Sequence, residues 1–347
     1  MLNNGISPTH MSFEAETPAM LHPAQPDREK LLSIICVNWN SEAYLLACIA
    51  SIFACPPPLP FEIIVVDNAS PDGSPDRLLN QFPQVTLIKS DTNLGFAAAN
   101  NLGFRHCKGE YILLLNPDTE VLGPALSLMI EELRSHPDAG IVGCTLLDSD
   151  LTPSTTSVQT FPTILNQILA FEWLRVRFPD CPLWNLTPLF RPKDAAIRVE
   201  VIPGACMMLT RDVFTRAGLL TEDYFMYAED IDLNFKVRQL GFSSYYVPGA
   251  HIIHHGGKSG MRQPASQWST VMVHRAMLLY FRLHHGSFYA ATYRATMCLS
   301  AVGRLLILAV ILPFTKGSRT RWSIEKWCAI FKWAVGLMPA RFSSQSA

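Results

Sequence analysis

The sequence predicts an α/β fold in which a mostly parallel sheet carries helices on both faces. Two patterns indicate it. From residue 31 onward, short apolar segments rich in β-branched side chains recur along the chain, as expected of strands buried on both sides. Segments whose apolar residues follow helical spacing lie between them. Strands that alternate with helices in this way are typical of a parallel sheet covered by helices.

The expected elements follow one another in order along the chain. Strands are expected at residues 31–37, 62–66, 85–88, 111–115 and 140–147. Helices are expected at residues 42–54, 96–107 and 123–135, the first of them stopped by three consecutive prolines. Residues 148–200 have no regular pattern and contain six prolines. A helix over residues 231–240 and an apolar run over residues 250–253 follow.

The composition sets limits on the class of protein. With 347 residues, 49% of them hydrophobic, and a formal net charge of −1, the chain has enough apolar side chains for a large core and is not globally disordered. Nine cysteines without a CxxC pair indicate reduced thiols in a cytosolic protein. Residues 1–30 contain four prolines and no continuous apolar stretch, so we expect a flexible tail there and not a secretory signal.

The even charge balance conceals an asymmetry between the two ends of the chain. Residues 256–347 hold twelve basic side chains and one acidic one, Glu325, whereas residues 1–255 carry a net charge of −12. A basic region of this kind indicates a surface that meets anions. Because the region is also strongly apolar and contains no recognised nucleic-acid-binding module, we expect an anionic membrane surface as its partner and no nucleic acid.

Within this basic region, two segments favour contact with a membrane. Residues 297–314 are apolar except for Arg304 and Pro313, and a charge at mid-bilayer costs roughly 2.5–3.5 kcal/mol, so a spanning helix is possible but not favoured. Residues 324–338 repeat apolar side chains at helical spacing beside Trp322 and Trp333. That pattern is typical of a helix lying in the membrane interface, and the alternative is a helix packed on the preceding domain.

Polar side chains gather where the predicted strands end. Asn38 and Asn40 follow the first strand, Asp67 ends the second, and Asn116 and Asp118 follow the fourth. In open α/β sheets ligands bind at the carboxyl ends of the strands. The first turn contains no glycine and the chain has no Walker loop, so neither backbone phosphate cradle is present. A bound nucleotide would therefore be held by side chains and a metal ion.

Six segments occur in an order that identifies a family. They are VNWN at residues 37–40, VVDNASPDGS at 65–74, NLGFAAANN at 93–101, LLNPDT at 114–119, EDIDL at 229–233 and HHGGKS at 254–259. Together they resemble the family 2 glycosyltransferases with a GT-A fold, most closely the bacterial rhamnosyltransferase-like branch. The resemblance covers about residues 31–262 and implies an inverting enzyme that uses a nucleoside-diphosphate sugar.

The resemblance also implies a role for each matching residue. Asp67 would contact the nucleobase or ribose, and Asp230 would be the general base that takes the proton of the acceptor hydroxyl. Residues lining the donor site would be Asn38, Asn40, Asn93, Gly95, Asn100 and Asn116. Asp118 and His254 would hold Mg²⁺ or Mn²⁺ on the diphosphate, as suits an oxygen and imidazole donor set. Gly204, Ala205 and Glu229 would wall the donor and acceptor pockets.

Local chemistry offers a structural alternative for several of these residues. Asp67 can open a turn through its own side chain, and Asn93 to Asn100 can be a turn followed by a capped helix. Asp118 can be a solvated residue of an Asn-Pro-Asp turn. Glu229 and Asp230 are favourable in the first turn of a helix because of its dipole. His255 competes with His254, since neighbours on a strand point to opposite faces.

The chain departs from the family pattern at two positions. Asn116 replaces the first acid of an Asp-x-Asp motif, which leaves the strength of metal dependence open, and Thr221 stands where the family usually has an acid. We expect a tail at residues 1–30, a catalytic domain at 31–262 (a nucleotide half at 31–147 and an acceptor half at 148–262) and a basic helical region at 263–347.

The expected function is an inverting, metal-dependent transfer of rhamnose or another hexose to a hydroxyl of a glycan or lipid-linked glycan in cell-envelope polysaccharide synthesis. The expected location is peripheral, at the cytoplasmic face of the inner membrane. Two alternatives remain: a sugar-nucleotide pyrophosphorylase, which normally has a glycine-rich loop after its first strand, and a non-catalytic glycan- or membrane-binding scaffold. The sequence does not define the sugar, nucleotide base, acceptor, linkage or oligomeric state.

Overall fold

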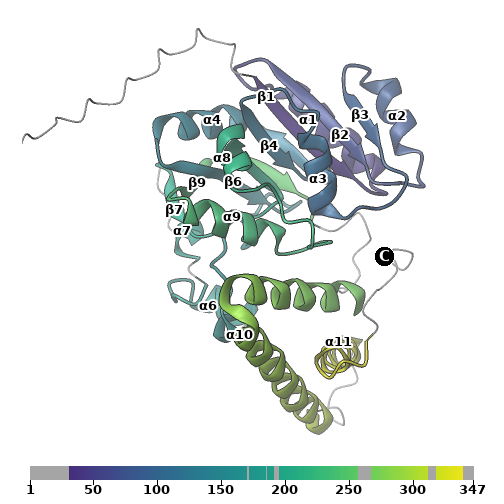
Figure 1. Cartoon of the computed structure of the whole chain (residues 1–347), viewed down its shortest axis with the longest axis vertical. Helices are drawn as coiled ribbons and strands as arrows, with labels where there is room; N and C mark the ends of the chain where they lie inside the picture. The colour runs from purple at the N-terminus through teal and green to yellow at the C-terminus, as the bar shows by residue number, and fades with distance from the viewer. Residues whose placement is uncertain are drawn as a thin grey trace, which may run out of the picture.

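The computed structural model describes residues 31–169, 172–184, 186–190, 195–256, 267–311 and 318–338. Within them lies one nine-stranded sheet with the strand order β3-β2-β1-β4-β8-β6-β9-β5, and β7 pairs with β9. Helices cover both faces of the sheet, and two further helices lie below it in Figure 1. The predicted α/β class is confirmed. The expected tail at 1–30, residues 257–259 of the last motif and the expected domain boundary at 262 lie outside the described residues.

The first half of the sheet is parallel, as predicted. It contains β1 (Leu32–Asn38), β2 (Phe61–Asp67), β3 (Thr86–Lys89) and β4 (Tyr111–Leu115). The connecting helices are α1 (Glu42–Ala54), α2 (Ser74–Gln81) and α3 (Phe96–Phe104). Asn38 and Asp67 are register partners at the ends of β1 and β2, so the polar residues predicted to meet at this edge of the sheet do meet.

The second half of the sheet mixes strand directions. It contains β5 (Thr119–Leu122), β6 (Ala139–Leu147), β7 (Ile197–Val199), β8 (Cys206–Thr210) and β9 (Ser243–His254). β8 runs antiparallel to β4 and β6, β9 runs parallel to β6, and β5 and β7 run antiparallel to β9. Its larger helices are α4 (Ala125–Ser135), α8 (Arg211–Arg216) and α9 (Glu229–Gln239). The region without a sequence pattern forms short helices, α5 (Ile164–Ile168), α6 (Glu172–Arg177) and α7 (Thr187–Phe190).

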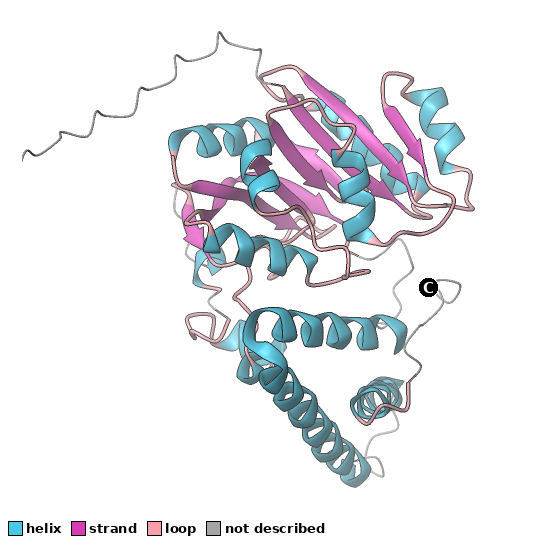
Figure 2. Ribbon diagram, in the orientation of Figure 1, coloured by secondary structure: helices cyan, strands magenta, loops and turns pink. Residues whose placement is uncertain are grey.

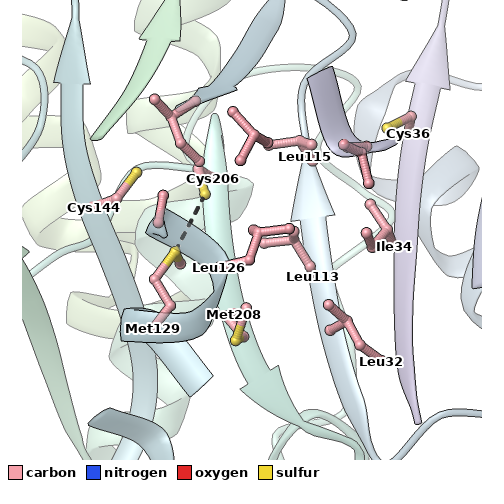
Figure 3. Close-up of a cluster of buried hydrophobic side chains, with 14 of the residues drawn as sticks. Leu32, Ile34, Cys36, Leu113, Leu115, Leu126, Met129, Cys144, Cys206 and Met208 are labelled. Atoms are coloured by element: carbon pink, nitrogen blue, oxygen red, sulfur yellow. Dashed lines mark hydrogen bonds between the residues drawn. The ribbon is translucent and has the colours of Figure 1, made fainter. Parts of the chain in front are cut away.

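The core of the domain consists of two apolar layers, one on each face of the sheet. On one face, alternate residues of β1 and β4 pack with α4, and Figure 3 shows Leu32, Ile34, Leu113, Leu115 and Met129 there. On the other face, Ile35, Ile112 and Leu114 pack with α8 and α9. The alternation follows from the two-residue period of a strand. All nine cysteines are free, as expected.

A third apolar cluster joins the C-terminal helices to the domain. α10 (Gln267–Ile311) is broken at Gly286, where φ is +86° and ψ is 168°. The part before the break packs under α9, and α11 (Ser318–Ala334) packs on α10 (Figure 2). For residues 324–338 the packed alternative was a helix on the preceding domain, but α11 packs on α10, and it is the part of α10 before the break that packs on the domain. By length and composition, α10 is the one helix in the described ranges that can cross a membrane.

Candidate active site at the carboxyl edge of the sheet

The site begins where β1 and β2 end. Asn38 is fully buried, and its side-chain amide donates hydrogen bonds to Asp67 Oδ1 (2.9 Å), Ser70 Oγ (3.0 Å) and Ser74 Oγ (2.6 Å). Asp67 Oδ2 accepts a hydrogen bond from the Ser70 amide at 3.2 Å, so the turn expected from local chemistry is present. Each carboxylate oxygen of Asp67 keeps a further lone pair. Asn38 thus orients Asp67, and Asp67 retains acceptor capacity for a nucleoside.

The next loop is held by paired asparagines. Asn68 donates to Asn93 Oδ1 (2.9 Å) and accepts from the Leu94 amide (2.8 Å), while Asn93 Oδ1 also accepts from the Gly95 amide (3.0 Å). Gly95 has φ +82°, and a Cβ there would lie 2.4 Å from the Phe225 carbonyl oxygen. Only glycine fits this position. The motif at 93–95 therefore fixes the approach of α3 to the loop before α9.

Two further asparagines of the predicted donor site, and a third one next to them, differ in their surroundings. Asn40 is exposed at the edge, with φ +50°. Asn100 is buried and donates to the Phe96 carbonyl at 3.0 Å within its own helix. Asn101, which the sequence analysis did not single out, bonds the Leu220 backbone and Glu222 and so ties α3 to the chain before α9. Of these residues, Asn40 is the one placed for direct contact with a ligand.

Asp118 and His254 lie together, as predicted. His254 Nε2 is 3.4 Å from Asp118 Oδ1, because β5 and β9 pair in a register that places Thr119 opposite His254. Asp118 is 6% exposed, which excludes the alternative of a solvated turn residue. His255 instead contacts Glu120 at 2.7 Å and Ser149 at 3.0 Å. The geometry therefore favours His254 over its neighbour as the partner of Asp118.

Asn116 connects this pair to β8. Its amide donates to the Ala205 carbonyl at 2.9 Å, and its carbonyl accepts from Thr119 Oγ1 at 2.8 Å. Its side-chain oxygen is buried and has no hydrogen-bond partner among the described residues. A buried oxygen left without a partner costs about 1–3 kcal/mol. This oxygen is consequently a free acceptor two residues from Asp118.

Asp230 lies beside Gly204. Its Oδ2 accepts a hydrogen bond from the Gly204 amide at 2.9 Å, and its Oδ1 accepts one from the Ile231 amide at 2.8 Å. A Cβ at Gly204 would lie 3.3 Å from Asp230 Cβ and 3.6 Å from the Phe96 ring. Burial raises the pKa of Asp230 above its usual value, although the two backbone amides oppose that rise. A carboxylate with a raised pKa is a stronger base.

Glu229 is buried, and one of its oxygens, Oε2, has no hydrogen-bond partner among the described residues. Burial, and then repulsion from Asp230 and Asp232, raise its pKa well above the usual value of a glutamate. The two neighbouring acids therefore differ in environment, since Asp230 is bonded by two amides. Such a difference is typical of functional carboxylates.

The start of α9 is supported by residues to which the sequence analysis gave no role, together with Thr221. Asp232 is 1% exposed and contacts Thr221 Oγ1 (2.7 Å), Lys236 Nζ (3.1 Å) and His284 Nε2 (2.7 Å). Burial alone would raise its pKa, but the bonds from His284, Lys236 and Thr221 lower it below the usual value. His284 belongs to α10, so the C-terminal helices anchor the helix that carries Asp230. A single histidine far along the chain gives no sequence signal for this contact.

One short segment links the two groups of predicted catalytic residues. The Gly204 amide contacts Asp230, and the next residue, Ala205, accepts the bond from Asn116, two residues before Asp118. The start of β8 therefore places Asp230 and the Asp118–His254 pair at the same edge of the sheet. The cavity of about 600 Å³ described below is a separate feature, lined by other residues.

The donor atoms at Asp118 suit a divalent cation. No cluster of three or more histidine, cysteine or acidic side chains suited to a metal occurs in the described residues. Mg²⁺-type sites nonetheless need only one or two protein ligands when substrate phosphates supply the others. Asp118 Oδ1 and His254 Nε2 lie 3.4 Å apart and are the oxygen and imidazole donors that Mn²⁺ accepts. The unpartnered oxygen of Asn116, two residues before Asp118 along the chain, is a further oxygen donor of the same kind.

The chain matches a family model and is similar to two rhamnosyltransferases. Residues 33–214 match the family described as Glycosyl transferase family 2. The chain is 26% identical over 283 residues to N-acetylglucosaminyl-diphospho-decaprenol L-rhamnosyltransferase of Mycobacterium tuberculosis (strain ATCC 25618 / H37Rv), covering 77% of this chain and 89% of the relative. It is 28% identical over 171 residues to rhamnosyltransferase WbbL of Escherichia coli (strain K12), covering 46% and 61% of the two chains.

Two solved structures share the fold. The mannosyltransferase PcManGT from Pyrobaculum calidifontis, in complex with GDP-Man and Mn2+, superposes with a TM-score of 0.51 at 17% identity, covering 92% of this chain and 90% of that one. GalNAc-T7 with UDP, GalNAc and Mn2+ superposes with a TM-score of 0.54 at 14% identity, covering 89% and 56%. At these identities the likeness concerns the fold.

Proposed function

Because the chain belongs to glycosyltransferase family 2 and is a glycosyltransferase with the GT-A fold, we propose that it transfers rhamnose or another hexose from a nucleoside-diphosphate sugar to a lipid-linked glycan of the cell envelope. Its similarity to the decaprenol-dependent rhamnosyltransferase over most of both chains supports this acceptor class. The observation that carries the proposal is the placement of Asp230 and the Asp118–His254 pair at one edge of the sheet, joined through Gly204, Ala205 and Asn116.

Asp230 is the general base of the proposed reaction. The acceptor O–H bond breaks and its proton moves to the Asp230 carboxylate, while the oxygen bonds to the anomeric carbon and the nucleoside diphosphate leaves from the opposite face. This inverts the anomeric centre without a covalent enzyme intermediate. The Gly204 and Ile231 amides orient the carboxylate, and Glu229 and Ala205 lie next to it and line the acceptor side.

The donor is bound at the ends of β1, β2 and β4. Asp67, oriented by Asn38, accepts hydrogen bonds from the nucleoside, and Asn40, with the loop of Asn93 and Gly95, lines its pocket. Asp118, His254 and Asn116 would hold Mg²⁺ or Mn²⁺ against the diphosphate. When bound, the cation neutralises the negative charge that develops on the leaving diphosphate. The Mn2+ in both related structures supports a divalent cation.

The C-terminal helices place the enzyme at a membrane surface in this proposal. Beyond the break at Gly286, α10 exposes large apolar side chains, which we call the apolar face of α10: Phe288, Leu299, Val302, Leu306, Ile307, Val310 and Ile311. Arg304 turns from this face and donates to the Ile168 carbonyl of α5 at 2.7 Å. The arrangement favours a helix lying on the cytoplasmic leaflet over one that spans the bilayer.

A donor screen tests the proposed function. The purified full chain is incubated with dTDP-, UDP- and GDP-linked sugars, with Mn²⁺, Mg²⁺ or EDTA, and with or without an N-acetylglucosaminyl-diphospho-lipid. We expect one donor to be consumed faster when the lipid acceptor is added, with sugar appearing on the lipid and consumption lost in EDTA. Equal donor consumption with and without acceptor, for every donor, would contradict transfer to a lipid-linked glycan.

A further inference from the structure

A cavity lies against α9 and is lined by residues other than those of the candidate active site. It has a volume of about 600 Å³, within the range of small-molecule sites. Its walls come from α5 and the residues before it, from the 182–183 loop, from α9 and from α10. Most of the lining surface is carbon, and the apolar lining residues are Phe161, Pro162, Pro182, Leu183, Phe235 and Tyr280.

The charged groups at this cavity neutralise one another. Arg238 lies 3.8 Å from Glu200, and its guanidinium stacks 5.4 Å from the centre of the Phe161 ring. Glu200 also accepts a hydrogen bond from the Phe161 amide at 2.9 Å. Burial, followed by the neighbouring His284, lowers the pKa of His285, the remaining titratable base of the lining. With its charges paired, the cavity suits an uncharged apolar group better than a nucleotide.

One polar group of the lining has no partner. The Tyr280 hydroxyl is buried and makes no hydrogen bond with the described residues, although its ring is fixed by contacts with Phe235 and His284. An unsatisfied buried hydroxyl is costly. Tyr280 is one of the lining residues, so an oxygen acceptor that reached its hydroxyl would remove that cost.

Two chain segments run from the cavity to the general base. Phe235 follows Asp230 on α9 by five residues, about 7.5 Å along the helix axis. Glu200 precedes Gly204, which bonds Asp230, by four residues, at most about 13 Å of extended chain. In a sugar-diphospho-lipid, one sugar and a diphosphate separate the lipid chain from the reacting hydroxyl. This separation is of the same order as the two distances between the cavity and Asp230.

We propose that this cavity binds the first isoprenoid units of the lipid-linked acceptor, with the Tyr280 hydroxyl donating to an oxygen at the head of the chain. The inference rests on the proposed function and adds to it the place where the lipid is recognised. The cavity adjoins the break in α10, because His285 lines it and Gly286 follows, and the exposed Leu165 and Phe288 lie within three residues of lining residues along the chain. A chain leaving the membrane along the apolar face of α10 therefore enters the cavity close to Asp230.

Equilibrium binding of a farnesyl-length isoprenoid phosphate to the full chain in detergent tests the proposal without a sugar donor. Leu183→Asp, which puts a charge in the cavity, is expected to weaken binding about tenfold or more. The control is Leu151→Asp, the same change at an exposed leucine outside the lining, and it should bind like the wild type. Equal binding by wild type and both variants would overturn the proposal.

Tyr280→Phe separates ligand contact from a structural role. Since the hydroxyl has no partner, its removal should leave Tm unchanged or raised while weakening isoprenoid phosphate binding about fivefold. Tyr293 on the same helix bonds His274 at 2.7 Å, so Tyr293→Phe should lower Tm and leave binding unchanged. Tyr280→Phe with unchanged binding, or with lowered Tm, would contradict the assigned role.

Activity measurements distinguish failure of this inference from failure of the proposed function. Acceptors with the same sugar-diphosphate head and one or several isoprenoid units are compared, and the longer chain should have the lower KM in wild type, an advantage that Leu183→Asp removes. Transfer with the same KM for the short and the long isoprenoid acceptor would overturn the cavity inference and leave the proposed function standing. Isoprenoid binding without any sugar transfer would instead refute the proposed reaction.

Discussion

At the scale of single residues, the proposed proton transfer depends on Asp230. Asp230→Asn keeps the shape of the side chain but removes the base, so we expect donor binding within about twofold of wild type and a kcat lower by about 10²–10⁴. Isothermal titration with the donor and initial rates with the acceptor measure the two quantities. Asp223→Asn, at an exposed acid on the preceding loop, is the control. Near-normal turnover by Asp230→Asn would remove Asp230 from its role.

The pH profile of the wild type follows from the same residue. Asp230 acts only when ionised, and burial raises its pKa. Activity should therefore fall as pH falls through a value above the ordinary aspartate range, giving an acid limb in kcat/KM that is absent from the residual activity of Asp230→Asn. A profile flat down to the ordinary aspartate pKa would contradict the raised pKa.

The two adjacent histidines allow a matched test of the metal site. His254 faces Asp118, whereas His255 contacts Glu120 and Ser149. His254→Ala should raise the Mn²⁺ concentration needed for half-maximal activity by about tenfold or more. His255→Ala should leave that concentration unchanged, with at most a small loss of Tm. Equal metal dependence in the two variants would rule out His254 as a ligand.

Replacing Glu229 is expected to raise stability and to lower activity. Its pKa is well above that of an unfolded glutamate, so the native state favours the neutral form, and stability falls as pH rises from about 4.5 toward the folded-state pKa. Glu229→Gln is neutral throughout, and we expect its Tm to exceed that of wild type by about 2 °C or more at pH 8 and to match it at pH 4. Turnover should also fall, because Glu229 lines the acceptor side in the proposed function. Thermal unfolding at both pH values tests the expected change in Tm, and turnover rates test the expected loss of activity.

The residues also show what sequence could predict at this scale. The meeting of Asp67, Asp118 and His254 at one edge was predicted because strand ends and motif order define it. The role of Asn38 in orienting Asp67 was not predicted, since an asparagine at a strand end is equally suited to bind a ligand or to orient a neighbour. Asp232, Thr221 and His284 form a cluster whose members come from three segments, and no spacing rule brings them together.

At the scale of elements, strong periodicity predicted structure well. The helix at 42–54 and the strand at 111–115 agree with α1 and β4 in both bounds. α2 and β5 were not predicted: α2 begins directly after a Ser-Pro-Asp-Gly stretch that is typical of a turn, and β5 has only four residues. α9 begins after Tyr227 and Ala228, which have φ +71° and +65°. Such left-handed non-glycine residues are strained, and composition gives no sign of them.

The break in α10 gives a prediction with an internal control. Gly286 has φ +86° and ψ 168°, a conformation close to glycine-only, and Gly303 lies in the helical part with open space around it. Gly286→Ala should lower the free energy of unfolding by about 1–3 kcal/mol. Gly303→Ala should raise it by about 0.5–1 kcal/mol, because alanine favours helix. Chemical denaturation of both variants measures this. A higher free energy of unfolding in both variants would mean that α10 is straight in solution.

At the scale of the whole molecule, the proposal gives the apolar and basic end of the chain two separate tasks, packing on the domain and contact with a membrane. Before Gly286, α10 packs on α9 through Tyr280 and Phe281, and His284 bonds Asp232. After Gly286, the helix leaves the domain and its apolar side chains are exposed, with Phe288 at 88% and Leu299 at 73%. The sequence predicted an apolar, basic region but left packing and membrane contact as alternatives. The structure shows the packing, and the break at Gly286 changes the direction of the helix so that the apolar side chains after it are exposed.

The exposed half of α10 predicts binding to anionic membranes. Leu306→Asp combined with Val310→Asp places two charges on the apolar face of α10, and each buried leucine or valine contributes about 1.5–3 kcal/mol to an apolar contact. We expect cosedimentation with vesicles containing anionic lipid to fall at least about tenfold in the double variant. Leu79→Asp, on α2 beside β3, is the control and should bind like the wild type. Because both changed side chains lie outside the active site, donor consumption in detergent should be unchanged, so a loss of vesicle binding together with retained chemistry would separate the two tasks. Vesicle binding that persists in the double variant would place the membrane contact elsewhere on the molecule.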